Sequence, residues 1–78
     1  MNDNNIQRSI DACAQRFLTI ARAGLATWQE TGDDHACGEW LSFDRALEHF
    51  VDQGLIRSFD VVAGTLTFND GTTFEVDA

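Results

Sequence analysis

The chain has 78 residues, of which 44% are apolar, and a formal net charge of −8 at pH 7. This length supports a single domain with a small core, and no stretch approaches the roughly 20 apolar residues of a membrane span. A strongly negative chain repels nucleic acid and anionic membranes, so we expect neither as a direct partner. The polar residues 1–5 do not resemble a signal peptide. We therefore expect a cytoplasmic protein, in a bacterium or in whatever infects one.

The first part of the chain has a helical repeat of apolar residues. They recur at spacings of three and four, at Ile6, Ile10, Cys13, Phe17, Ala21, Leu25 and Trp28. This pattern predicts an amphipathic helix over about residues 5–30, with Ala14 and Leu18 widening the apolar stripe on one side. Gly24 lowers the helix propensity by roughly 1 kcal/mol relative to Ala. It marks either a close contact between helices or a kink.

A loop and a second helix are predicted next. Glycines interrupt the acidic segment 31–41, which predicts an exposed loop. Ser42 is a good N-cap for a short helix over about residues 43–53, which has an apolar face of its own. Gly54 stands where a left-handed C′ residue belongs, and Leu55 follows it, as in a Schellman ending.

From residue 56 the apolar residues alternate with polar ones. This period of two predicts strands over about 56–62, 65–68 and 72–77, separated by turn residues. The strands form an antiparallel meander with one apolar face, and that face must be covered by the helices. The predicted fold class is α+β, in which a long first helix and a short second helix pack on one face of a three-stranded antiparallel β-meander.

The turns between the strands predict their register. A two-residue loop after the first strand would place Phe59 opposite Phe68. A three-residue loop after the second strand, with Gly71 in a left-handed conformation at a bulge, would place Leu66 opposite Phe74. The first loop would also place Val61 opposite Leu66, so the apolar side chains of all three strands share one face of the sheet.

The side chains that could serve as soft metal ligands are Cys13, His35, Cys37 and His49. His35 and Cys37 lie too close in sequence for a usual zinc site, and Cys13 belongs to the apolar helix face. A Cys37–His49 nucleophile pair lacks an orienting group and an oxyanion motif. We expect two free thiols, no metal, no cofactor and no enzymatic activity.

The negative charge is concentrated in the second part of the chain. Residues 1–29 contain three Arg and two acids, a net charge of +1, whereas residues 30–78 contain two Arg and eleven acids, a net charge of −9. Asp44, Glu48 and Asp52 repeat every four residues and so share one helix face, roughly 6 Å apart along the axis. Two interpretations stay open. This face either serves solubility only or imitates a phosphate backbone and binds a Lys/Arg-lined groove of a partner.

The candidate partner-binding residues are the acids from residue 30 to residue 52. They are Glu30, Asp33, Asp34, Glu39, Asp44, Glu48 and Asp52. In size, charge and architecture, over its whole length, the chain resembles the phage-encoded anti-CRISPR proteins, a group without a common motif. The resemblance implies an acidic inhibitor, monomeric or homodimeric, that occupies the basic DNA-recognition surface of a CRISPR-Cas effector. A type I Cascade-like complex is the expected partner.

An alternative function belongs to a different class. The chain would then be a small regulatory or antitoxin-like module that dimerises or docks through its apolar helix. An exposed remainder of the stripe between Ile6 and Trp28 would favour this alternative, because a three-stranded sheet is small for so long a helix. Binding by acidic groups should weaken steeply with ionic strength, whereas apolar docking should persist.

Overall fold

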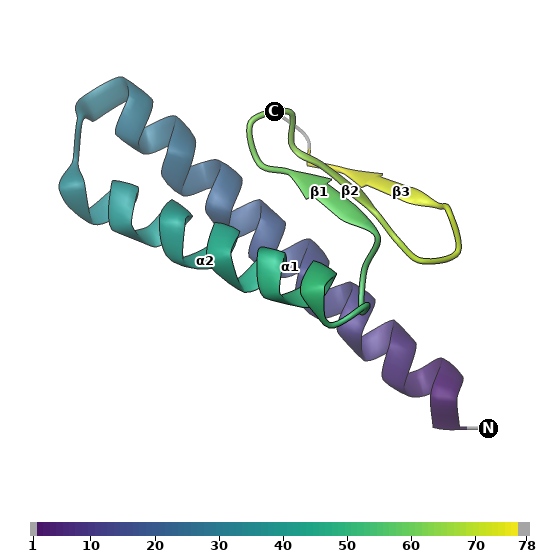
Figure 1. Cartoon of the computed structure of the whole chain (residues 1–78). Coiled ribbons are helices and arrows are strands. Elements are labelled where there is room, and N and C mark those ends of the chain that lie inside the picture. Colours follow the sequence, from purple (N-terminus) through teal and green to yellow (C-terminus); the bar gives the residue numbers. More distant parts are fainter. Residues whose placement is uncertain (1, 77–78) are drawn as a thin grey trace.

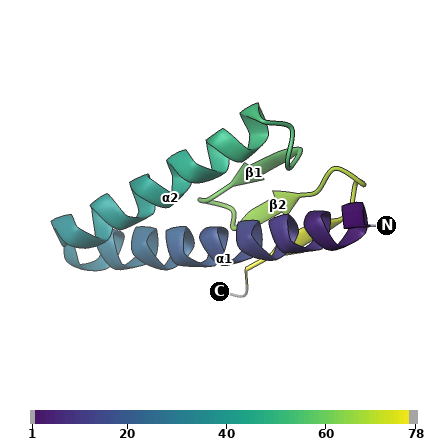
Figure 2. The same cartoon turned by 90° about the horizontal axis from the view of Figure 1, so that it is seen from below.

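A computed structural model of the protein describes the backbone of residues 2–76 and the side chains of residues 5–76. The elements follow in the order α1 (Asn2–Thr31), α2 (Asp34–Asp52), β1 (Ser58–Asp60), β2 (Thr65–Thr67) and β3 (Thr73–Glu75). The strands form one antiparallel sheet in the order β1-β2-β3, so the predicted α+β class with a three-stranded meander is confirmed. Figure 1 shows the sheet beside α1, clear of the connecting end of the two helices. In the view of Figure 2 the two helices diverge away from their connection, and the sheet packs against them towards the open end.

The hydrophobic core lies where the two helices and the sheet meet. Its largest fully buried side chains are Leu18, Leu47, Ile56 and Leu66. The buried face of α1 is centred on other residues than the predicted stripe. Ala14, predicted at the edge of the stripe, is completely buried, whereas Ile6, predicted within it, is 57% exposed. The physical reason is that α1 packs against both α2 and β2. Its buried face is therefore centred between these two neighbours.

The first helix begins three residues earlier than predicted and continues through Gly24 to Thr31. Of the two alternatives for Gly24, the structure shows the close helix contact. A Cβ atom at this position would lie 3.1 Å from the backbone oxygen of Ala36 in α2. The missing side chain thus allows the two helices to approach each other.

The predicted loop over residues 31–41 is wrong, because α2 begins at Asp34. The N-cap is Asp33, whose carboxylate accepts a hydrogen bond from the backbone N–H of His35 at 3.1 Å. An Asp in this position satisfies one of the backbone donors that the first turn leaves free. Ser42, the predicted N-cap, lies inside the helix.

Packing explains why the helix extends through Gly38. Ala36 is buried, and Trp40 packs against the core, so the apolar spacing of α2 continues upstream of the predicted start. Both residues lie against Gly24 of α1. This contact offsets the roughly 1 kcal/mol by which Gly38 disfavours a helix relative to Ala.

The predicted end of α2 is confirmed. The helix ends at Asp52, and Gly54 follows with a φ of 72°. The Leu55 N–H donates to the Phe50 carbonyl at 2.8 Å, and the Gly54 N–H donates to the Val51 carbonyl at 3.0 Å. These two bonds define a Schellman motif.

The predicted β2–β3 hairpin is also confirmed. Leu66 lies opposite Phe74, and Gly71 has a φ of 92°. The Phe68 N–H donates to the Thr72 carbonyl at 2.8 Å, which leaves a three-residue loop between them. Glycine adopts this left-handed conformation without the steric cost that other residues incur.

The predicted β1–β2 hairpin is wrong in register. Phe59 lies opposite Leu66 instead of Phe68, because the loop contains four residues instead of two. The Gly64 N–H donates to the Asp60 carbonyl at 2.8 Å, which closes one helical turn. The register differs by two residues, and since side chains alternate with a period of two, Phe59 stays on the predicted face.

The strands are shorter than the predicted segments 56–62, 65–68 and 72–77, because each contains only three residues. Val61 belongs to the β1–β2 loop, where its buried side chain still contributes to the core. Residue 77, the predicted end of the last strand, lies outside the described residues. In the described part of the chain, neither helix combines the length and apolar character needed to cross a bilayer.

Candidate protein-binding surface

The structure distributes the seven candidate acids over three elements. Glu30 lies in the last turn of α1, Asp33 lies in the connection, and the others lie on α2. The five residues on α2 are Asp34, Glu39, Asp44, Glu48 and Asp52. The predicted set is therefore not one continuous face.

Four carboxylates share one side of α2, which we call the acidic flank: Asp34, Asp44, Glu48 and Asp52. At about 3.6 residues per turn, Glu48 is rotated by only about 40° from Asp44 and from Asp52. Asp34 precedes Asp52 by about five complete turns and so returns to the same side. With about 1.5 Å of rise per residue, the acidic flank is about 27 Å long.

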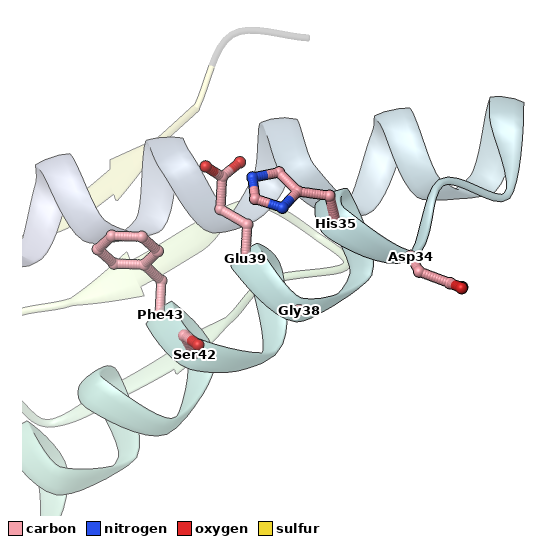
Figure 3. A pocket seen from close by; sticks show the side chains of 6 residues that line it. All are labelled: Asp34, His35, Gly38, Glu39, Ser42 and Phe43. Atoms are coloured by element: carbon pink, nitrogen blue, oxygen red, sulfur yellow. The ribbon is translucent and has the colours of Figure 1, made fainter.

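Glu39 lies outside the acidic flank. It precedes Glu48 by about two and a half turns, so the two side chains point in opposite directions from the helix axis. Glu39 lines a shallow depression together with His35 and Phe43. Figure 3 shows these three side chains on the same side of α2, with Asp34 turned away from them. The structure thus separates Glu39 from the predicted set.

Asp33 has a structural role, because its carboxylate caps α2 through the N–H of His35. The side chains of Asp34, Glu48 and Asp52 are exposed, and that of Asp44 is partly buried. Exposed carboxylates on a helix are available to cations on another molecule. The acidic flank is thus the part of the predicted set that can make one contact with a partner.

Leu41 is an apolar residue on the acidic flank that sequence reasoning missed. It is 48% exposed, and it lies on the same side of α2 as Asp44 and Glu48. Leu41 precedes Asp44 by three residues, a spacing that places two residues of one helix on the same side. The spacing becomes informative only when α2 is known to begin before Leu41. Exposed leucines are common individually, but this one lies between carboxylates, where a partner would contact both.

The residues with metal-binding potential do not meet. No group of three or more His, Cys, Asp or Glu side chains that could hold a metal ion occurs among residues 5–76. Cys13 and Cys37 are free thiols, and both are partly buried. Cys13 was expected on the apolar helix face, whereas Cys37 was expected in an exposed loop. His35 and Glu39 are neighbours on α2 (Figure 3), but two side chains are too few for a structural metal site.

Comparisons with known proteins add no assignment: no protein-family model, no curated protein and no solved structure matches this chain.

Proposed function

We propose that the protein acts by binding a basic surface of another protein, and that the acidic flank makes this contact. The observation that carries the proposal is the alignment of four carboxylates on one side of α2, three of them exposed. Like charges four residues apart destabilise a helix by a few tenths of a kcal/mol per pair. Solubility alone needs acids on the surface but does not need them aligned, so the alignment favours a binding role.

The partner that we propose is the DNA-recognition surface of a CRISPR-Cas effector, with a type I Cascade-like complex as the first candidate. Proteins bind the DNA backbone mainly through Lys and Arg, and aligned carboxylates compete for the same side chains. On this proposal the protein is an anti-CRISPR inhibitor of the DNA-mimic type that acts in the cytoplasm of the bacterial host. The proposal is supported by the chain's size, its net charge of −8 and the acidic flank.

The test is a competition experiment with a purified type I effector complex and its target DNA. The protein should block DNA binding, and its apparent affinity should fall steeply between 50 and 500 mM salt, concentrations chosen to vary screening. The triple variant Asp44→Lys, Glu48→Lys, Asp52→Lys should abolish the inhibition. Circular dichroism should show that this variant keeps its helices.

A matched control separates the acidic flank from net charge. The variant Asp60→Lys, Asp70→Lys, Glu75→Lys has the same formal net charge of −2 as the first triple variant, since each reverses three charges of a −8 chain. Asp60, Asp70 and Glu75 are exposed and lie in the strands and their loops, away from both helices in sequence. This control should retain most of the inhibition, and circular dichroism should show that it stays folded. Equal loss in both variants would show that only overall charge matters. No inhibition by the unaltered protein of any effector would reject the proposed partner.

A second candidate function is supported by the exposure of the α1 stripe at its ends. Ile6 is 57% exposed and Trp28 is 37% exposed, so the sheet and α2 leave part of the apolar stripe uncovered. A regulatory or antitoxin-like module that docks or dimerises through α1 would use this surface. Analytical ultracentrifugation at low and high salt tests dimerisation, because an apolar dimer should persist at high salt. The variant Ile6→Asp should then dissociate it.

A further inference from the structure

The end of the helical hairpin is formed by the last turns of α1, the connection and the first turns of α2. In both views it projects beyond the sheet (Figures 1 and 2). Trp28 and Trp40 pack against each other between the two helices, with ring centroids 6.3 Å apart and ring planes tilted by 39°. Of the two residues, Trp28 is the more exposed, at 37%. It lines a shallow depression together with Gln29 and Gly32.

The tryptophan pair is not optimal for stability. The Nε1 atom of Trp40 is buried and has no hydrogen-bond acceptor among the described residues. A buried donor without a partner costs about 1–3 kcal/mol. The packing of the large Trp40 ring against the core and against Gly24 offsets this cost.

The segment between Arg22 and Arg45, which forms the hairpin end, has formal charges of one sign. Residues 23–44 contain five acids and no Lys or Arg, which gives a formal charge of −5 for the segment that forms the hairpin end. The negative charge of the hairpin end therefore attracts a cation before the cation touches the protein. Among aromatic side chains, tryptophan binds cations on its face most strongly.

We propose that the exposed face of Trp28 is an anchor for an Arg side chain of a basic partner protein. Arg fits this position because its guanidinium is planar, stacks on aromatic rings and is more weakly hydrated than an ammonium group. Trp40 supports the ring from the inner side, and the surrounding carboxylates supply the attraction. The inference rests on the proposed function only in that the partner is basic. It concerns the ring of Trp28, and the charge around that ring includes Asp34 and Asp44 of the acidic flank.

The test uses peptides and therefore does not depend on the effector. The chain has two tryptophans, so its ¹H–¹⁵N spectrum contains two indole N–H signals, which the variant Trp28→Phe assigns. The probe is the peptide acetyl-Gly-Arg-Gly-Arg-Gly-amide at low salt. It should shift the Trp28 indole signal saturably, and the same peptide with citrulline in place of Arg should leave that signal unchanged. Trp28→Leu should weaken the apparent Kd for the Arg peptide, measured from the shifts of the neighbouring backbone amides, by about two- to fivefold.

The backbone amide of Glu48 reports the acidic flank in the same spectra, so the two proposals can fail separately. An Arg peptide that shifts the Glu48 amide but not the Trp28 indole would overturn the anchor and leave the proposed function standing. A response at Trp28 with none at Glu48 would support the anchor and count against the acidic flank. A Trp28 indole signal that moves with protein concentration alone would show that a second copy of the chain covers the ring, which also overturns the anchor.

Discussion

Gly24 of α1 lies so close to Trp40 of α2 that a Cβ atom on residue 24 would be 3.2 Å from the Cβ of Trp40. The same atom would be 3.1 Å from the backbone oxygen of Ala36, which cannot move without the rest of α2. This contact holds the hairpin end together. It also allows α2 to begin at Asp34 despite the glycine at position 38.

The first prediction compares two glycines in helices. Gly24→Ala gains about 1 kcal/mol of helix propensity but overpacks the contact with α2 at a cost of about 1–3 kcal/mol. We expect a net loss of about 1 kcal/mol in the free energy of unfolding, measured by urea denaturation. Gly38→Ala is the control, because a Cβ there would meet nothing within 4 Å, and it should gain up to about 1 kcal/mol. Equal gains in both variants would show that the helices have room to separate.

Local signals were sufficient for several parts of the fold. Gly54 and Leu55 predicted the end of α2, since a Schellman motif depends on a few adjacent residues. The left-handed Gly71 predicted the β2–β3 register, because loop length determines which residues face each other. Both were correct since the information lies within one turn of the chain.

Other parts depended on contacts between distant residues. The glycines at 32 and 38 predicted a loop, but packing of Ala36 and Trp40 on Gly24 makes this segment helical. The β1–β2 loop was missed for a local reason, since the Asp60 carboxylate accepts a hydrogen bond from the Ala63 N–H at 3.1 Å and favours a helical turn. Such side-chain bonds compete with a tight hairpin.

In the candidate site, too, some features follow from local sequence and others depend on the fold. The alignment of Asp44, Glu48 and Asp52 follows from their spacing alone. By contrast, the addition of Asp34 to the acidic flank and the removal of Glu39 required the true start of α2. A helix position is known only when the helix boundary is known, so these two residues could not be placed from the sequence.

The second prediction compares two leucines of α2. Leu47 is fully buried, so Leu47→Ala should lower the free energy of unfolding by about 2–5 kcal/mol. Leu41 is 48% exposed, and Leu41→Ala should change the free energy of unfolding by less than about 0.5 kcal/mol. Thermal and urea unfolding measure both.

The same Leu41→Ala variant tests the binding surface. It should weaken binding to the basic partner at both low and high salt, because the lost contact is apolar and is not screened. Val62→Ala is the matched control, since Val62 is even more exposed but lies in the β1–β2 loop. Similar affinities for both variants would remove Leu41 from the proposed contact.

The third prediction concerns the pKa of Asp70 in the β2–β3 loop. The Thr72 hydroxyl donates to its carboxylate at 2.6 Å and the Thr72 N–H donates at 2.9 Å. These bonds hold the pKa of Asp70 below its ordinary value, with the hydroxyl as the largest cause. Thr72→Val removes the hydroxyl and keeps the N–H, so the pKa of Asp70 should rise towards its ordinary value of about 3.9. A ¹³C titration of the carboxyl group measures it, with the exposed Thr73→Val as control.

The sign of the corresponding stability change follows from the lowered pKa. A carboxylate with a lower pKa in the folded state contributes stability above its unfolded pKa of about 3.9 and loses it as the pH falls through the folded pKa. The unaltered protein should therefore lose more stability than Thr72→Val when the pH falls below about 4. Parallel stability curves for the two proteins in this range would contradict the assignment of the hydrogen bond.

The last prediction links stability and binding at Asp52. This residue lies in the last turn of α2, four residues after Glu48, so its charge opposes both the helix dipole and its neighbour. Asp52→Lys reverses both effects and should raise the free energy of unfolding by about 0.5–1 kcal/mol at low ionic strength. High salt should remove most of this gain.

The same variant should bind the basic partner more weakly, which would show that the acidic flank retains a destabilising charge for the sake of binding. Gln53→Lys is the control, because it adds a cation beside the helix end and leaves the Asp52 carboxylate in place. Its free energy of unfolding should rise only by the part that comes from the helix dipole, and it should bind the partner more tightly than Asp52→Lys does. A more stable Asp52→Lys variant with unchanged affinity would instead mean that the carboxylate at residue 52 is not part of the contact.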